Sequence, residues 1–293
     1  MPELPEVETT VLQLREKLLG KKFTSLWIGD KKIIKKPSLE TFKKNFLLKK
    51  IEKIDRRGKN ILIFLEGGKI ILIHLKLTGH LLLDKWEKVN DIWKPVLNPN
   101  IFLDPVNRFL RIILFLDDGR GLALSDLRRF AKIEGWSKKD FEKENPLSKL
   151  GPEPLDAKFD FKAFKKRILL ASKRPIKVAL MDQEIIAGIG NIYSDEILWQ
   201  AKVHPLKKVQ DLTLNELKKI FLSMKDLLPK AIKLGGESIS DFRHINGSKG
   251  NFDALRKVYR REGEKCPRCQ SKISRLKIRQ RSSYFCPNCQ KLR

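Results

Sequence analysis

Four cysteines constrain the fold of this chain more than any other feature, because all of them fall within its last 28 residues. They form two Cys-x2-Cys pairs separated by 16 residues, a spacing typical of a structural zinc site. Four thiolates make a closed tetrahedral site without an open position for a substrate, so one Zn²⁺ is expected to fold the tail rather than to catalyse. Two disulfides are the alternative, which a cytosolic environment disfavours. The predicted zinc ligands are Cys266, Cys269, Cys286 and Cys289.

The charge balance indicates a polyanionic partner. The 293 residues carry 62 Lys and Arg against 35 Asp and Glu, and residues 255–293 alone carry 13 against 2. Nucleic acid is the first candidate for such a partner, and an anionic membrane surface is the second. No apolar run approaches the roughly 20 residues that a membrane helix requires. The N-terminus is acidic and lacks an apolar signal region, so we expect a cytoplasmic protein.

The chain begins with residues suited to covalent catalysis. Removal of Met1 would leave Pro2 with a free secondary amine, and an α-amino group with a pKa of about 8 is partly neutral at pH 7. A neutral amine can attack a sugar C1′ and form an iminium, and Glu3 and Glu6 lie beside it on one helix face. The alternative is an ordinary helix start, in which proline needs no N–H partner and the acids complement the helix dipole.

Hydrophobic patterning predicts a strand-rich half followed by a helical half. Residues 3–19 predict a first helix, and residues 60–75 and 109–125 predict two hairpins with glycine turns. The apolar runs of these hairpins favour a β-sandwich, whereas the polar stretch 84–100 is expected to be a loop insertion. A linker is expected near residues 137–155, and helical periods follow at 161–171, 177–186, 192–201 and 214–234.

Two motifs in the second half suit contact with nucleic acid. Residues 187–191, Ala-Gly-Ile-Gly-Asn, form a glycine-rich turn at the start of a helix, where N–H groups suit a phosphate. A plain tight turn is the competing interpretation. Residues 275–284 are expected to form a basic hairpin between the two cysteine pairs, which either binds nucleic acid or is simply solvated.

Seven segments, two of them already described, carry recognisable motifs. They are Pro2–Thr9, Arg57–Lys59, His74–Gly79, Asp126–Phe130, Gly151–Leu155, Met181–Gln183 and Ala187–Tyr193. Together with the cysteine pairs, and in this order, they resemble the formamidopyrimidine-DNA glycosylases of bacterial base-excision repair almost from end to end. Leu4 favours the oxidised-purine branch, because the endonuclease VIII branch typically has glycine at that position.

The resemblance implies an α+β multidomain fold. It comprises an N-terminal β-sandwich with flanking helices, a helical helix–two-turn–helix domain and a C-terminal four-cysteine zinc-finger β-hairpin. The implied boundaries are 1–137 for the catalytic domain, 138–152 for a linker, 153–254 for the helical domain and 255–293 for the zinc finger. The resemblance also implies a monomer that acts on damaged double-stranded DNA in the bacterial cytoplasm, associated with the nucleoid, without a redox or organic cofactor.

The implied activity is removal of oxidised purines, 8-oxoguanine and formamidopyrimidines, followed by β,δ-elimination at the abasic site. Pro2 would attack C1′ and form the Schiff base, Glu3 would act as general acid–base, and Glu6 would position the N-terminus. Lys59 would approach a DNA phosphate at the active site.

An enzyme that acts on a base inside a duplex must extrude that nucleotide and fill the gap. The resemblance assigns the filling to Leu77, Arg128 and Phe130 on two insertion loops, and Leu77 stands where the family usually has methionine. Residues 235–252 resemble the family's lesion-capping loop. The other implied DNA-binding residues are His74, Lys177, Asn191 and Arg281.

Two other functions remain open. An endonuclease VIII-like glycosylase for oxidised pyrimidines is disfavoured by Leu4 and by the gap-filling residues. A catalytically silent zinc-ribbon protein that binds damaged DNA would share the charge and the cysteines, but it has no use for a free Pro2 beside Glu3.

Overall fold

The computed structural model describes residues 1–292, which divide into two compact units. The first unit combines residues 1–146 with residues 234–253, and the second combines residues 147–233 with the chain from residue 254 onward. The segment 234–253 therefore returns to the N-terminal unit after the helical part. The domain boundaries expected at residues 137, 152 and 254 stay a prediction. Within the described residues, no helix is both long enough and apolar enough to cross a membrane.

The first unit is the expected sandwich of two sheets, with strand orders β1-β9-β10-β6 and β2-β11-β5-β4-β3. Side chains from both sheets, among them Phe23, Ile63 and Leu114, form one buried core. The strands are β1 (Phe23–Ile28), β2 (Ile34–Lys36), β3 (Ile51–Arg57), β4 (Asn60–Leu65), β5 (Lys69–His74), β6 (His80–Asp84), β9 (Leu110–Leu116), β10 (Gly121–Ser125) and β11 (Lys132–Ser137).

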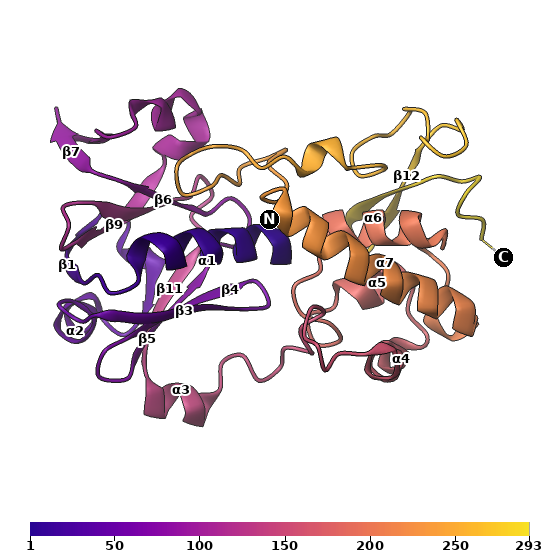
Figure 1. The fold of residues 1–293 in the computed structure, drawn as a ribbon, viewed down its shortest axis with the longest axis horizontal. Coiled ribbons are helices and arrows are strands. Elements are labelled where there is room, and N and C mark those ends of the chain that lie inside the picture. The colour runs from indigo at the N-terminus through magenta and orange to yellow at the C-terminus, as the bar shows by residue number, and fades with distance from the viewer. Residues whose placement is uncertain (293) are drawn as a thin grey trace. The chain divides into compact units, whose positions relative to one another are not determined.

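Helix α1 (Leu4–Leu18) confirms the helix expected near the N-terminus, and it packs against strand β3 (Figure 1). Val7, Val11, Leu14 and Leu18 recur every three or four residues, so they share one helix face, and all four are fully buried. The unit also contains α2 (Leu39–Phe46) and α3 (Lys138–Glu144), the latter inside the stretch expected to be a linker.

Residues 84–100 are a correction, because they form a hairpin rather than a loop. Strands β7 (Trp86–Val89) and β8 (Ile92–Pro95) pair with each other. The Asp84 carboxylate closes the base of the hairpin by accepting N–H groups of residues 96–98 at 2.8–3.0 Å. Trp86 and Trp93 pack with aromatic side chains of the sandwich, so the hairpin has a small hydrophobic core of its own.

The returning segment 234–253 is fastened to the sandwich at several points. The carbonyl of Ile245 accepts the N–H of Leu83 at 2.7 Å. Arg243, which is 4% exposed, pairs with Asp104 at 2.6 Å. Asp104 lies between the short 3-10 helices η2 (Pro99–Leu103) and η3 (Pro105–Arg108), so the stretch that follows the β7–β8 hairpin supports the returning segment.

The second unit is helical and ends in a β-hairpin. Helix α5 is shorter than the helix expected at 177–186, because residues 182–190 form the two turns that precede α6. The Gln183 side chain organises these turns by accepting the Gly188 N–H at 2.9 Å and donating to the Ile189 carbonyl at 2.7 Å. The elements are α4 (Phe161–Ile168), α5 (Ile176–Met181), α6 (Asn191–Ala201), α7 (Leu214–Lys233), β12 (Ser274–Ile278) and β13 (Arg281–Phe285).

Candidate active site and nucleic-acid contacts

The start of helix α1 places the predicted acids in one buried site. Glu3 and Glu6 are 2% and 1% exposed, and Pro2 directly precedes them. One carboxylate oxygen of Glu6 accepts the N–H of Glu3 at 2.7 Å, and the other accepts the N–H of Glu237 at 2.8 Å. Glu6 therefore joins the N-terminus to the returning segment 234–253, which is the geometry of a positioning residue.

The surroundings of the amino terminus lower the pKa of its α-amino group. Burial lowers the pKa of the Met1 α-amino group, Lys59 acts in the same direction, and Glu3 and Glu6 oppose both effects. While Met1 is present, the Pro2 nitrogen belongs to a peptide bond and is no nucleophile. Removal of Met1 would expose the Pro2 amine to the same neighbours, and burial would favour its neutral form.

Lys59 lies in a turn that contacts with Arg56 hold in place beside this site. It lies with Gly58 in the two-residue turn between β3 and β4 and is 6% exposed. Arg56 donates to the Gly58 carbonyl at 3.0 Å and pairs with Glu8 of α1 at 2.6 Å. Sequence reasoning missed Arg56 and Glu8, since no local pattern connects residues 48 positions apart.

Asp126 joins the two predicted insertion loops. Its buried carboxylate accepts the Thr78 hydroxyl and the N–H groups of Arg128 and Ala131, the latter two at 3.2 and 2.8 Å. Phe130 is 49% exposed, and the Arg128 guanidinium lies 4.7 Å from its ring. An exposed aromatic ring beside a cation is suited to wedging between base pairs. Leu77 is half-buried next to Thr78, at the junction of the two loops.

His74, at the end of β5, is a neutral imidazole among lysines. Burial, together with Lys76, Lys132 and Lys59, lowers the pKa of His74 to about 3. Its Nδ1 accepts the N–H of Lys76 at 3.0 Å, so the proton of the neutral ring resides on Nε2. An N–H donor surrounded by cations is suited to a phosphate oxygen.

In the second unit, Lys177, Asn191 and Arg281 come together at strand β13. Lys177 is 1% exposed, and its Nζ pairs with Asp195 at 2.5 Å and lies 3.5 Å from the Ser282 carbonyl. Asn191, the first residue of α6, donates to the same carbonyl at 3.0 Å. Arg281 is the residue before Ser282 and is exposed. Lys177 thus supports the strand that carries Arg281, and its own contact with DNA stays a prediction.

The four cysteines form a cluster that fits a metal ion. They are free thiols, and their Sγ atoms all lie within 4.8 Å of one another. A tetrahedral zinc with Zn–S bonds of about 2.3 Å needs sulfur atoms about 3.8 Å apart, so this donor set matches Zn²⁺. Both pairs close the same turn, in which Gln270 and Gln290 donate N–H groups to the carbonyls of Cys266 and Cys286 at 2.9 Å.

Sequence reasoning also missed the close approach of Gly236 to Glu6. A Cβ at Gly236 would lie 2.7 Å from Glu6 Oε1 and 3.2 Å from Glu6 Cα, and its φ of +76° favours glycine. The paired glycines 235–236 were the available signal, because glycine often marks a close backbone approach.

Three known families match successive parts of the chain. Residues 1–133 match the formamidopyrimidine-DNA glycosylase N-terminal domain, and residues 150–243 match the formamidopyrimidine-DNA glycosylase H2TH domain. Residues 263–292 match a zinc finger found in FPG and IleRS. The third match agrees with the cysteine cluster.

Full-length relatives and solved structures show the same likeness. The formamidopyrimidine-DNA glycosylase of Pelotomaculum thermopropionicum is 38% identical over 293 residues, covering 100% of both chains. A Lactococcus lactis FPG mutant in complex with Fapy-dG-containing DNA has a TM-score of 0.85 at 32% identity, covering 99% of this chain and 100% of that chain. A complex of wild-type Lactococcus lactis Fpg with oxidised-pyrimidine-containing DNA has a TM-score of 0.84 at 32% identity, with the same coverage.

Proposed function

The chain belongs to the formamidopyrimidine-DNA glycosylase family, and we propose that it excises oxidised purines from double-stranded DNA and then cleaves the abasic site. The observation that carries this proposal is the buried start of α1, where Pro2 adjoins Glu3 and Glu6 with Lys59 nearby. The Lactococcus complex with Fapy-dG-containing DNA supports the oxidised-purine substrate class.

The residues of this site would perform the reaction in sequence. The Pro2 amine, freed by removal of Met1, attacks C1′ while the bond to the damaged base breaks. Glu3 supplies and removes protons at the sugar as the ring opens to an iminium. The iminium acidifies C2′, so that loss of a C2′ proton expels the 3′ oxygen and a second elimination expels the 5′ oxygen. Lys59, in the turn that Arg56 contacts, would hold the phosphate beside the reacting sugar.

The insertion loops and phosphate contacts would present the nucleotide. Extrusion of a base costs a few kcal/mol, which the wedge residues offset by filling the gap. The exposed Phe130–Arg128 pair and Leu77 are suited to this task. Besides Lys59, the predicted phosphate contacts are His74, Asn191 and Arg281.

The cysteine cluster would hold one structural Zn²⁺. A closed four-thiolate site has no open coordination position, so the ion would stabilise the fold around the β12–β13 hairpin and leave the chemistry to Pro2. We further infer that the protein works as a monomer on bacterial DNA in the cytoplasm, near the nucleoid.

The test is borohydride trapping on a duplex that holds one 8-oxoguanine opposite cytosine. Wild-type protein should give a covalent adduct that maps to the Pro2 peptide, and Pro2→Gly should abolish that adduct. Glu3→Gln should reduce adduct formation strongly. Glu16→Gln is the matched control, because Glu16 lies on the same helix but its side chain is 69% exposed.

Two results would overturn the proposal in different ways. Tight binding of the lesion duplex without any adduct would make the protein a silent binder of damaged DNA. An adduct formed only with oxidised pyrimidines would retain the mechanism and change the substrate. A duplex with an oxidised pyrimidine is therefore tested as well, because the Lactococcus protein has been solved in complex with such DNA.

A further inference from the structure

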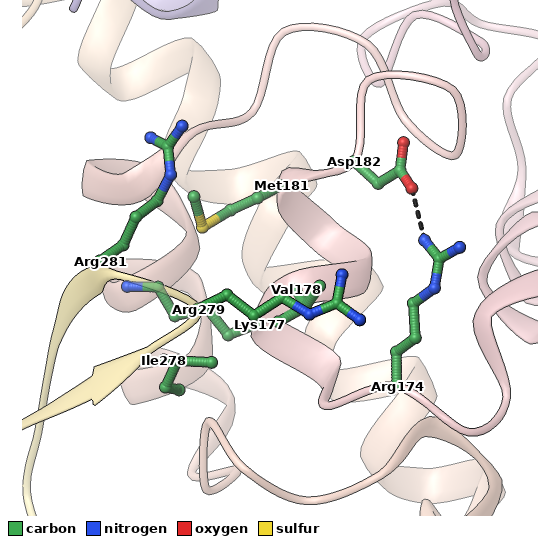
Figure 2. Close-up of a pocket in the computed structure, with 8 residues that line it drawn as sticks. All are labelled: Arg174, Lys177, Val178, Met181, Asp182, Ile278, Arg279 and Arg281. Atoms are coloured by element: carbon green, nitrogen blue, oxygen red, sulfur yellow. Dashed lines mark hydrogen bonds and ion pairs between the residues drawn. The ribbon is translucent and has the colours of Figure 1, made fainter.

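A cavity with cationic walls lies in the second unit, beside the turn of the β12–β13 hairpin (Figure 2). Its volume is about 240 Å³, which exceeds the space that one water needs and lies below the roughly 300–1,000 Å³ of pockets for drug-sized ligands. A phosphate-sized group with its remaining water fits such a space. The cations that line it are Arg174, Lys177, Arg279 and Arg281.

Two of these four charges are already neutralised. Arg174 pairs with Asp182 at 2.6 Å, and the Lys177 amine pairs with buried Asp195 at 2.5 Å. Across residues 1–292, neither Arg279 nor Arg281 forms an ion pair with a carboxylate. The cavity therefore retains two uncompensated guanidinium groups.

Arg279 reaches the cavity from an unfavourable backbone position. It forms the hairpin turn with Gln280, and the two residues have φ values of 43° and 63°. Such turns favour glycine and asparagine, because a Cβ is crowded in the left-handed region. Strained residues of this kind cluster at ligand clamps. Figure 2 shows the Arg279 side chain extending from the hairpin toward Arg174.

The charge decides which ligand suits this cavity. Val178, Met181 and Ile278 give it an apolar part, but a neutral ligand would displace water from two guanidinium groups without replacing the lost hydrogen bonds. An anion with several oxygens suits such a cavity, because guanidinium binds phosphate through paired N–H donors.

We propose that this cavity binds one phosphate group of DNA, held by Arg279 beside the fixed Arg174–Asp182 pair, with Arg281 lining another part of the cavity. The proposal rests on the proposed function and deepens it, because it adds Arg279 to the DNA contacts. The phosphate has two possible sources. One is an internal phosphodiester of the intact strand, and the other is the terminal phosphate left when the abasic sugar is eliminated.

The first experiment measures how the dissociation constant depends on salt. The probe is a duplex that holds an uncleavable tetrahydrofuran abasic analogue. Loss of one phosphate contact reduces the slope of log K against log salt by about 0.9. The affinity advantage of wild type over Arg279→Gly should therefore shrink about 3.5-fold between about 50 and about 200 mM salt.

Arg260→Gly is the matched control. Arg260 is exposed, has a φ of 54° and does not line the cavity, so both substitutions remove one arginine from a left-handed residue of the same unit. Arg260→Gly should leave the slope within error of wild type. An equal change in both variants would overturn the proposal. An unchanged slope in Arg279→Gly on the intact duplex, together with unchanged binding of a 3′-phosphorylated product, would also overturn it.

Two further duplexes distinguish the sources of the phosphate. Both mimic the gapped product, one with a 3′-phosphate and one with a 3′-hydroxyl. If the pocket holds an internal phosphodiester, Arg279→Gly weakens binding to the intact duplex and to both products alike. If it holds the terminal phosphate, the loss is confined to the 3′-phosphorylated product, and product release by the variant becomes faster.

Failure of this proposal can be told from failure of the proposed function. The borohydride adduct of the wild type tests the proposed function, whereas DNA binding by Arg279→Gly tests the pocket. Normal trapping by the wild type, with unchanged binding of the intact duplex and of the 3′-phosphorylated product by Arg279→Gly, rejects the phosphate pocket alone. Absence of trapping in the wild type rejects the glycosylase itself.

Discussion

Replacing Gly236 with alanine tests whether the returning segment 234–253 holds the start of α1, where the proposed catalytic residues lie. The new Cβ would lie 2.7 Å from Glu6 Oε1, 2.9 Å from Glu6 Cγ and 3.2 Å from Glu6 Cα. A change of side-chain rotamer cannot relieve the contact with Cα, so the backbone of one segment must move. The N–H of the next residue, Glu237, would then leave its 2.8 Å contact with the Glu6 carboxylate.

The magnitude follows from two separable costs. Alanine in the left-handed region costs about 1–2 kcal/mol, and overpacking of a filled site adds about 1–3 kcal/mol. We therefore expect Gly236→Ala to lower the free energy of unfolding by about 2–5 kcal/mol in total.

Gly119→Ala separates the two costs. Gly119 has a φ of +82°, but a Cβ there would meet nothing within 4 Å, so only the conformational cost of about 1–2 kcal/mol applies. Urea unfolding of the full chain measures the difference between the variants. Borohydride trapping measures whether the displaced Glu6 slows adduct formation in Gly236→Ala and leaves Gly119→Ala at the wild-type rate.

Equal destabilisation by the two substitutions would refute this reasoning, because it would mean that the contact with Glu6 costs nothing. Normal trapping by a destabilised Gly236→Ala would refute the positioning role of the returning segment, while leaving the steric argument intact.

Three further predictions concern the metal, a histidine and a buried ion pair. Chelation of Zn²⁺, or Cys286→Ser, should unfold the β12–β13 hairpin and abolish tight DNA binding, as circular dichroism and a binding assay would show. Because the folded pKa of His74 is about 3 against an ordinary 6.5, the unfolded chain binds an extra proton between these pH values, so stability falls as pH falls. His74→Gln should flatten that decline by up to about 1.4 kcal/mol per pH unit in urea unfolding, and NMR should find no titration of His74 from about pH 8 to about pH 5. Asp195→Asn should destabilise the second unit by about 3–5 kcal/mol, because it removes the carboxylate that compensates the buried Lys177 charge, whereas Asp195→Leu combined with Lys177→Met should recover most of that loss.

Features whose residues lie close together in the sequence were predictable. The spacing of the cysteines identified the metal-ligand cluster, and the proline-glutamate start located a helix whose acids lie at its first turn. The hairpins β4–β5 and β9–β10 were also predictable, because glycine turns separate apolar strands of nearly equal length.

Contacts between distant segments were not predictable. Glu6 meets Glu237, and Asp126 meets Thr78, only because the chain folds back, and no residue pattern near either partner records this. The β7–β8 hairpin was missed because its four-residue strands carry charged side chains outward. The end of α5 was overestimated because Ile185 and Ile186 continue the apolar pattern, although they are buried in the turns that follow.

The return of residues 234–253 to the N-terminal unit has a consequence for biosynthesis. A ribosome completes residues 1–146 first and must translate the whole helical part before Glu237 exists to bind Glu6. At 5–20 residues per second, that wait lasts roughly 5–20 s. The nascent sandwich therefore carries an unfinished candidate site throughout this interval, and an N-terminal fragment released early would lack one of the two N–H donors to Glu6. Translation order thus delays completion of this site until most of the chain has been made.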